Sequence, residues 1–257
     1  MFAPVTKALL SDAGIRPGDL VLDVATGAGD PALSVADEVG PTGKVIGIDP
    51  APRMIEGARR AATQLDLNNT QFEIAGADAL PFPTETFDAE VSRFGVMFFP
   101  SPVDGVREML RVLKPGKKLS FAVWHFVENN PFHHALARIV DSYIAPIPVL
   151  PDAPDAFRFA SPGKLRSVLA EAGAIEPVER VLRFPIDAPL SVEDFWAMRM
   201  EWSEKLREKL AQLPAEQLRE LKNQGIRAFT EYHNGHGMSF PAEVLIVTGT
   251  KQSMARG

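Results

Sequence analysis

A glycine-rich turn follows a short apolar run early in the sequence. The run Val21-Leu22-Asp23-Val24-Ala25 leads into Thr26-Gly27-Ala28-Gly29-Asp30, and a helical pattern opens at Pro31. Glycines at positions 27 and 29 permit a tight turn and a close approach of the backbone to a ligand, which a Cβ atom would block. A strand, a turn and a helix in this order place a ligand against the N-terminus of the helix. The sequence therefore predicts a ligand site at this turn.

An acidic residue in the right position extends this site. Asp49 ends the second apolar run, twenty residues beyond Gly29, where a carboxylate can accept hydrogen bonds from a ribose diol. The turn also satisfies the relaxed dinucleotide fingerprint Gly27-x-Gly29-x-x-Ala32. A carboxylate inside the first strand, at Asp23, can take up a ligand's ammonium group or support the loop. The first of these roles argues against a nicotinamide dinucleotide, because that ligand has no ammonium group to place there. Pro31 removes one of the N–H groups that would hold a pyrophosphate.

The elements around this site alternate between strands and helices. Apolar, β-rich runs at 20–25, 44–49, 71–75, 87–93 and 118–124 predict strands, and helical patterns at 31–39, 52–65 and 103–113 lie between them. Nearly continuous apolar strands are typical of a parallel sheet covered on both faces. We expect an α/β fold with a doubly wound, mostly parallel, seven-stranded, Rossmann-like sheet.

The second half of the chain has a different texture. A short helical stretch at 132–143 precedes a proline-rich run from Pro146 to Pro162, and a helix at 161–172 with Ser161 as its N-cap and Gly173 at its end follows. A strand at 177–185, a charged helical segment at 191–233 broken at Pro214, and a last strand at 242–250 complete the chain. We expect one domain over 1–257, with a cofactor-binding core at about 18–125 and cap or lid segments at about 126–160 and 191–233.

Composition excludes several classes of protein. The chain has 257 residues, 27 Lys+Arg against 33 Asp+Glu and a net charge of −6, which argues against a nucleic-acid backbone as the main partner. The absence of cysteine excludes disulfides, Cys-ligated zinc and a cysteine nucleophile. No run approaches the ~18 apolar residues of a membrane span, and no targeting signal is recognisable. We expect a cytoplasmic location, and the oligomeric state stays open.

Four sequence blocks carry a family resemblance. Together these blocks resemble class I S-adenosylmethionine-dependent methyltransferases. They read VLDVATGAGDPAL, VIGIDPAPRMIEGAR, AGADALPFPTETFDAEVSRFGVMFF and LRVLKPGKKLSFAVW. The resemblance is greatest to the ubiquinone/menaquinone-biosynthesis C-methyltransferase group, and it covers about residues 18–125. The family's first glycine position is Ala25 in this sequence.

The resemblance implies a set of contacts with S-adenosylmethionine. Asp23, Ala25, Gly27 and Gly29 would line its methionine moiety, with the Ala25 carbonyl receiving the ammonium group. Asp49 would bind the ribose hydroxyls, with Pro50 and Met54 beside the adenine. Asp78 would accept from the adenine amino group, and Ala79 would donate its backbone N–H. Arg93 and Phe94 would close the sulfonium side through backbone atoms.

Residues for the acceptor come from later in the chain. Displacement at a sulfonium methyl group depends largely on positioning, and a carbon or oxygen nucleophile often needs a base. His125, after the fifth strand, is the candidate base, with a packing role beside Trp124 as the alternative. Trp124, His134 and Trp196 are candidate substrate-binding residues, although a Met and Trp stripe around Trp196 also fits core packing. Arg199 and Arg207 could hold an anion, with a solvated surface as the default.

The predicted function is methyl transfer to a small acceptor. Apolar and aromatic cap residues favour an apolar or aromatic acceptor, methylated on oxygen or carbon. No carboxylate cluster follows the fourth strand, where Arg93 stands, so we expect no metal. The turn from Tyr232 to Gly237 is expected to be a plain hairpin turn rather than a metal site. An NAD-dependent oxidoreductase and a non-catalytic cofactor-binding protein are the alternatives.

Overall fold

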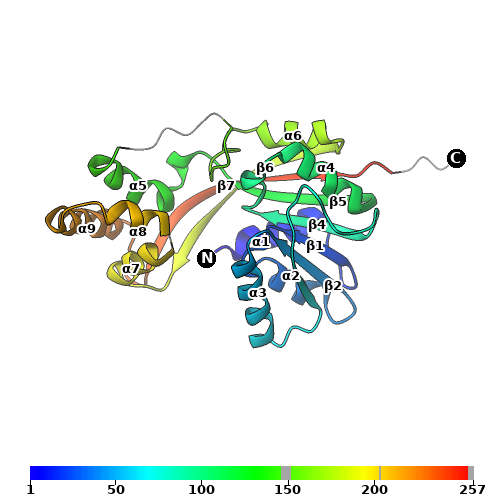
Figure 1. Cartoon of the computed structure of the whole chain (residues 1–257), viewed down its shortest axis with the longest axis horizontal. Coiled ribbons are helices and arrows are strands. Elements are labelled where there is room, and N and C mark those ends of the chain that lie inside the picture. Colours follow the sequence, from blue (N-terminus) through cyan, green and yellow to red (C-terminus); the bar gives the residue numbers. More distant parts are fainter. Residues whose placement is uncertain (146–151, 203, 254–257) are drawn as a thin grey trace. The chain divides into compact units, whose positions relative to one another are not determined.

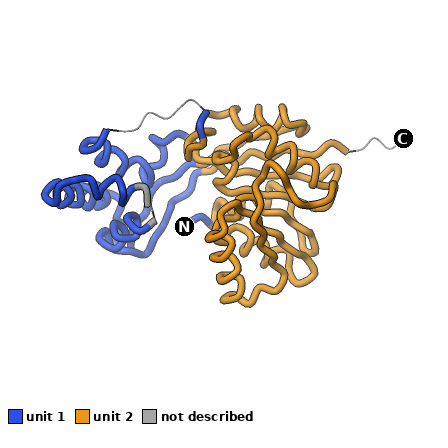
Figure 2. The backbone as a smooth tube through the Cα atoms, viewed as in Figure 1, with its two compact units in different colours: residues 1–2, 126–153, 183–243 blue, residues 3–125, 154–182, 244–257 orange. Residues whose placement is uncertain are grey.

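The computed structural model describes residues 1–145, 152–202 and 204–253 (Figure 1). The chain divides into two compact units, which Figure 2 distinguishes by colour. We call residues 3–125, 154–182 and 244–257 the core unit, and residues 1–2, 126–153 and 183–243 the helical unit. Part of the expected lid, the proline-rich stretch at 146–151, lies outside the described residues.

The sheet has seven strands in the order β3-β2-β1-β4-β5-β7-β6. The strands are β1 (Leu20–Val24), β2 (Lys44–Asp49), β3 (Thr70–Ile74), β4 (Phe87–Arg93), β5 (Leu113–Trp124), β6 (Ile175–Ala188) and β7 (Met238–Thr250). The first five pair in parallel, and β7 pairs antiparallel with β5. The expected doubly wound, mostly parallel sheet is confirmed.

The strand order creates a switch point at β1. From β1 the chain moves outward through β2 to β3 and then returns to place β4 on the other side of β1. The connections that follow β1 and β4 therefore leave the sheet in opposite directions. Between them a crevice opens outside the carboxyl ends of these two strands. The fold therefore sets a ligand site where the glycine-rich turn follows β1.

The core unit contains five helices and one 3-10 turn among its described residues. These are α1 (Ala3–Ala13), α2 (Ala32–Val39), α3 (Pro52–Gln64), α4 (Pro102–Val112), α6 (Lys164–Ala172) and the turn η1 (Val96–Phe98). The sequence patterns did not predict α1, although its Val5 and Leu9 side chains are completely buried in the core. The N-cap assigned to Ser161 was wrong. Helix α6 begins after Gly163, whose φ is 83° and whose N–H donates to the Glu179 carboxylate at 2.8 Å.

A second boundary also differs from its prediction. The helix expected at 103–113 ends at Val112, close to its predicted end, but the strand expected at 118–124 already begins at Leu113. Leu113 pairs with Phe87, and the register shifts before Lys118 pairs with Ala89. Pro115 is tolerated at this end because the strand is irregular there and no regular ladder bond is lost.

The helical unit contains η2 (Val127–Asn129), α5 (Pro131–Tyr143), α7 (Val192–Trp202), α8 (Glu204–Leu210) and α9 (Ala215–Thr230). Its interior is aromatic: the Phe195 ring lies 5.1 Å from that of Phe229 and 5.0 Å from that of Phe240. The Phe195–Phe229 pair is edge-to-face, at an interplanar angle of 86°, and this geometry adds attraction to the burial of apolar surface. This cluster holds the helices of the unit together.

The turn from Tyr232 to Gly237 joins α9 to β7. His233 forms an isolated antiparallel bridge with Met238, and the Asn234 N–H donates to the Gly237 carbonyl at 3.0 Å. A turn is present as expected, but it joins a helix to a strand through one isolated bridge and is not a hairpin between two strands. Among the described residues, no helix combines the length and apolar character needed to cross a membrane.

Candidate functional site

The glycine-rich turn has a backbone that few residue types adopt. Gly27 has φ 56°, Gly29 has φ 114°, and Ala25 also lies in the left-handed region at 59°. At Ala25 this conformation costs about 1 kcal/mol, so the surrounding structure must hold it. A Cβ atom on Gly29 would lie 3.2 Å from the Cα atom of Ala58 in α3. Gly29 therefore permits close packing of the turn on α3, whereas the turn at Gly27 is open.

Asp23 holds the turn from below. Its carboxylate accepts hydrogen bonds from the Thr26 hydroxyl at 2.6 Å and from the Ala32 N–H at 3.0 Å. The residue is fully buried, and burial raises the pKa of its carboxyl group to about 7 against the lowering effects of Thr26, Arg93 and Ala32. Of the two roles considered for Asp23, the geometry supports the structural one, because the carboxylate ties the end of β1 to the first turn of α2.

Asp49 connects the second strand to the same turn. One carboxylate oxygen accepts a hydrogen bond from the Gly27 N–H at 3.1 Å, and the other accepts one from the Ala51 N–H at 2.9 Å. A carboxylate oxygen can accept more than one hydrogen bond, so both oxygens retain capacity for hydroxyl donors. The side chain is thus fixed in orientation before any ligand binds.

A cavity of about 530 Å³ opens at the carboxyl ends of β1, β2 and β4. We call it the core cavity. Of the predicted cofactor residues, eight line it: Ala25, Gly27, Asp49, Pro50, Met54, Asp78, Arg93 and Phe94. Three do not, namely Asp23, Gly29 and Ala79. The first two support the turn, and Ala79 lies exposed beside Asp78.

The Arg93 side chain has a role of its own. It is almost buried, donates to the Thr6 hydroxyl at 2.6 Å and to the Asp30 carbonyl at 3.0 Å, and pairs with the Asp30 carboxylate at 2.5 Å. The guanidinium group therefore joins α1, β4 and the glycine-rich turn. Sequence analysis considered only backbone contacts for this residue and missed this link, because the link depends on Thr6, 87 positions away.

The end of β4 turns sharply beside the cavity. Phe94 has φ 61°, its N–H donates to the Ala122 carbonyl at 2.9 Å, and its ring stacks on Trp124 with centroids 4.4 Å apart. The next residue is Gly95, where a Cβ atom would lie 2.5 Å from the Cβ atom of Ala25. Only glycine lets the ends of β1 and β4 approach this closely.

The structure adds lining residues that the sequence patterns did not single out. They are Val24, Thr26, Ala28, Asp30, Ala75, Gly76, Ala77, Gly95, Phe98, Phe99 and Pro100. Among them, Phe98 is the residue that could have pointed to this rim of the cavity. Its large apolar side chain stays 53% exposed there. Arg158 also donates to the Phe99 carbonyl at 2.7 Å, which fixes this rim from a distant part of the chain.

The predicted acceptor residues fall in different places. Trp124 and His125 are buried at the end of β5 in the core unit, and neither lines the core cavity. In the helical unit, Trp196 is buried against α9, where a Cβ atom on Gly225 would lie 2.0 Å from its ring. Its surroundings match the packing alternative. His134 lines a separate cavity of about 730 Å³ within the helical unit.

That second cavity is formed by α5, β6 and β7. Its residues are Glu128, Asn129, Pro131, His134, Arg183, Phe184, Pro185, Tyr232, Ser239, Pro241, Ala242 and Glu243. Arg183 pairs with Glu243 at 2.7 Å, and Asn129 donates to the same carboxylate at 2.9 Å. The charges of Arg183 and Glu243 on this wall therefore neutralise each other.

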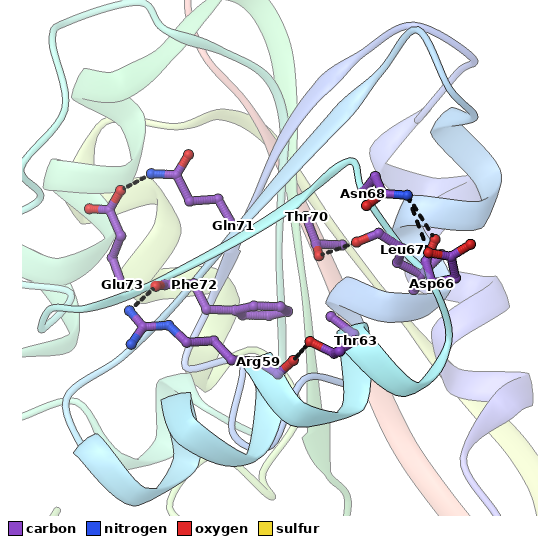
Figure 3. A pocket seen from close by; sticks show the side chains of 10 residues that line it. Arg59, Thr63, Asp66, Leu67, Asn68, Thr70, Gln71, Phe72 and Glu73 are labelled. Atoms are coloured by element: carbon purple, nitrogen blue, oxygen red, sulfur yellow. Dashed lines mark hydrogen bonds between the residues drawn. The ribbon is translucent and has the colours of Figure 1, made fainter.

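A polar groove lies on the core unit between α3 and β3, and Figure 3 shows its side chains. Arg59 donates to the Phe72 carbonyl at 2.6 Å, and Gln71 donates to Glu73. These polar side chains therefore form hydrogen bonds with other residues of the groove. Across the described residues, no group of three His, Asp or Glu side chains is arranged to hold a metal ion.

Residues 21–116 match the family described as a methyltransferase domain. This segment contains the glycine-rich turn, Asp49, Asp78 and the end of β4. Over this segment the chain matches a methyltransferase domain, in agreement with the class I resemblance of the sequence blocks. The cofactor of the domain is S-adenosylmethionine, as the sequence blocks indicated.

Curated relatives of the methyltransferase domain act in quinone biosynthesis by name. The ubiquinone/menaquinone biosynthesis C-methyltransferase UbiE of Ectopseudomonas mendocina is 40% identical over 51% of this chain and 50% of its own length. The demethylmenaquinone methyltransferase of Listeria monocytogenes is 39% identical over 41% of this chain and 45% of its own. The chain thus spans about half the length of these relatives.

Similarity of fold extends over nearly the whole chain. The YcgJ protein of Bacillus subtilis superposes with a TM-score of 0.61 at 21% identity, covering 97% of this chain and 98% of that one. At this identity the likeness concerns the fold. The methyltransferase-domain match ends at residue 116, so the helical segments at 126–153 and 183–243 lie outside it.

Proposed function

We propose that this protein transfers the methyl group of S-adenosylmethionine to a carbon or oxygen atom of a small apolar or aromatic acceptor. The observation that carries the proposal is the core cavity, in which Asp49 and the Gly27 turn are held together at the switch point of the sheet. The matched methyltransferase domain covers the same residues.

The cavity suits the parts of the cofactor. In the proposed complex, the Asp49 carboxylate accepts hydrogen bonds from the ribose hydroxyls, and Asp78 lies at the adenine side with Met54. Ala25, Gly27 and Phe94 border the methionine side. Because Asp49 is already oriented by two backbone N–H groups, little side-chain freedom is lost when the ligand binds.

Methyl transfer depends more on positioning the acceptor atom than on activating the leaving group. The sulfonium group is a good leaving group, so displacement at its methyl carbon needs an acceptor atom held in line and the exclusion of water. For an acceptor hydroxyl or an activated ring carbon, a base must also take a proton. His125 follows β5 beside the Phe94–Trp124 stack and is the base that we propose.

The proposed acceptor class follows from the relatives and the helical unit. The curated relatives are named for methylation of quinone precursors, and the helical unit is rich in aromatic side chains. Both support an aromatic acceptor. Since this chain spans half of the relatives' length, the identity of the acceptor is part of the proposal.

The test begins with the cofactor. Calorimetry should show micromolar or tighter binding of S-adenosylhomocysteine and no binding of NADH. Transfer from methyl-labelled S-adenosylmethionine to a panel of phenols, hydroquinones and aromatic acids should then yield a labelled product. Binding of S-adenosylhomocysteine without transfer to any acceptor would indicate a non-catalytic protein, and binding of NADH alone would contradict the proposal. The His125→Ala variant should lose kcat and keep its affinity for S-adenosylhomocysteine.

A further inference from the structure

Arg199 of α7 is a partly buried cation in the helical unit. Its Nε atom is shielded from solvent and has no hydrogen-bond partner among the described residues. No salt bridge forms to its guanidinium group within the described part of the chain. Burial alone lowers the pKa of this group to about 10, with no acidic neighbour raising it. A guanidinium group without a counter-charge is costly in such a place, because desolvation of a charge is offset only by a partner.

The contacts that Arg199 does make leave its donors available. The guanidinium carbon lies 4.3 Å from the centroid of the Phe132 ring in α5. A planar cation stacked on an aromatic face gains attraction through that face, and its N–H groups point outward in the plane. Those N–H groups form a fork that matches the two oxygens of a carboxylate.

Four carboxylates of the helical unit have partners other than Arg199. Asp141 pairs with Lys209 at 3.4 Å, Glu220 with Arg227 at 3.1 Å, and Glu243 with Arg183 at 2.7 Å. Asp194 accepts from the Ser191 hydroxyl at 2.7 Å. Arg199 therefore differs from the other arginines of this unit that form ion pairs within it.

The surroundings of Arg199 indicate which anion fits. His133 lies close enough for the charge of Arg199 to depress its pKa, and burial is the larger cause of a pKa of about 3. His133 is therefore neutral near pH 7 and adds no second positive charge. One cation matches a monoanion better than a phosphate dianion. The ring of Phe132, which packs 5.9 Å from that of Phe195, provides an aromatic environment.

We propose that Arg199 binds the carboxylate of an aromatic carboxylic acid, with the Phe132 ring behind the guanidinium group. The choice of an aromatic acid rests on the proposed function, whose acceptor class is aromatic. The role differs from the solvated surface expected for this arginine from the sequence. Arg207, the other candidate, is exposed and donates to the Met200 and Glu201 carbonyls.

The first experiment measures binding alone. Benzoate and 1-naphthoate are titrated by calorimetry at pH 7 against the wild-type chain, with benzamide and 1-naphthamide as neutral probes of the same shape. We expect the carboxylates to bind at least about tenfold more tightly than the amides, and Arg199→Met to remove this preference. Arg207→Met is the matched control and should bind like the wild type. Absence of carboxylate binding to the wild type, or unchanged binding to Arg199→Met, would overturn the proposal.

A second measurement separates binding from folding. Because Arg199→Met removes a partly buried charge that has no counter-charge among the described residues, its melting temperature without ligand should equal or exceed that of the wild type. A lower melting temperature with unchanged carboxylate affinity would make Arg199 a packing residue and overturn the proposal. If Arg199→Met does not fold, Arg199→Lys replaces it and should bind the carboxylates more weakly than the wild type, since it lacks the fork. Wild-type affinity in Arg199→Lys would overturn the fork geometry.

The outcome is independent of the methyl-transfer proposal. S-adenosylhomocysteine affinity should be the same in the wild type and in Arg199→Met, because the residues that line the core cavity all lie in the core unit. Carboxylate binding without any methyl transfer would contradict the proposed function and leave the Arg199 site standing. Methyl transfer without carboxylate binding would do the reverse.

Discussion

The Asp49 carboxylate accepts a hydrogen bond from the Gly27 N–H at 3.1 Å, which joins the end of β2 to the glycine-rich turn after β1. Two parallel strands thus present one preformed surface to the cofactor. The arrangement orients the carboxylate and the turn together, so a change at Asp49 should affect both.

Asp49→Ala should weaken S-adenosylhomocysteine binding by about 2–4 kcal/mol, because two charge-assisted hydrogen bonds to the ribose are lost. Asp49→Asn should lose less, since the amide oxygen still accepts one hydrogen bond. Calorimetry on the folded variants measures both. Equal affinity in the wild type and Asp49→Ala would show that the carboxylate serves the turn and not the ligand.

Gly95→Ala should disturb the junction between β1 and β4. The added Cβ atom would lie 2.5 Å from the Cβ atom of Ala25 and 2.6 Å from the Ser92 hydroxyl, and overpacking of this kind costs about 1–3 kcal/mol. Both the free energy of unfolding and the affinity for S-adenosylhomocysteine should fall. These are measured by urea denaturation and calorimetry.

Gly57→Ala is the matched control for Gly95→Ala. Gly57 lies inside α3, and the nearest atom to a new Cβ atom is 3.4 Å away, at Ala28. Replacing glycine by alanine within a helix stabilises by about 1 kcal/mol, so this variant should be at least as stable as the wild type. A similar loss in both variants would contradict the steric explanation.

Glu90 should make stability fall as pH rises. It lies on β4 with no exposed surface, and within the described structure neither carboxyl oxygen has a hydrogen-bond partner. Burial raises its pKa well above the ordinary value of 4.5, although Lys251 and Arg111 oppose this shift. Above pH 4.5 the unfolded chain releases this proton and the folded chain keeps it, so the free energy of unfolding decreases with pH up to the raised pKa.

Glu90→Gln removes this dependence, because the amide is neutral in both states. The melting temperature of Glu90→Gln minus that of the wild type should therefore increase between pH 4.5 and 8. Glu108→Gln provides a control of opposite sign, since the hydrogen bond from Arg111 lowers the pKa of Glu108. The stabilisation by Glu108 is present above pH 4.5 and is lost as pH falls through its lowered pKa. Parallel pH profiles for the two variants would refute the assignment.

Trp196 and Gly225 should be strongly coupled. Gly225→Ala places a Cβ atom 2.0 Å from the Trp196 ring, so it should destabilise the wild type by ~1–3 kcal/mol. Trp196→Ala alone should cost ~3–5 kcal/mol through the cavity that it leaves. In the double variant the alanine fills part of that cavity, and Gly225→Ala should cost less or become stabilising.

A double-mutant cycle from urea denaturation measures this coupling, with S-adenosylhomocysteine affinity as a second readout that should not change while the protein remains folded. Additive effects would place Trp196 and Gly225 apart. A selective rise in the acceptor KM of Trp196→Ala at unchanged stability would instead restore the acceptor-wall role expected from the sequence.

The local features of this protein were readable from its sequence. The strands at 20–25, 44–49 and 87–93, the turn with Gly27 and the acid at Asp49 all depend on short-range patterns, since alternation of apolar runs and glycine conformational freedom act over a few residues. The parallel sheet then required the ends of β1, β2 and β4 to meet, so eight predicted lining residues reached one cavity.

Other features depended on contacts between distant segments. The sequence alone did not distinguish between two roles for Asp23, and the hydrogen bonds from Thr26 and Ala32 support the structural one. Arg199 and Arg207 belong to the same charged stretch, yet packing against Phe132 buries only the first. The burial of a charged group depends on which remote side chains exclude water from it, so burial is a property of the packed chain. The same is true of the free-energy cost of leaving that charge unpaired.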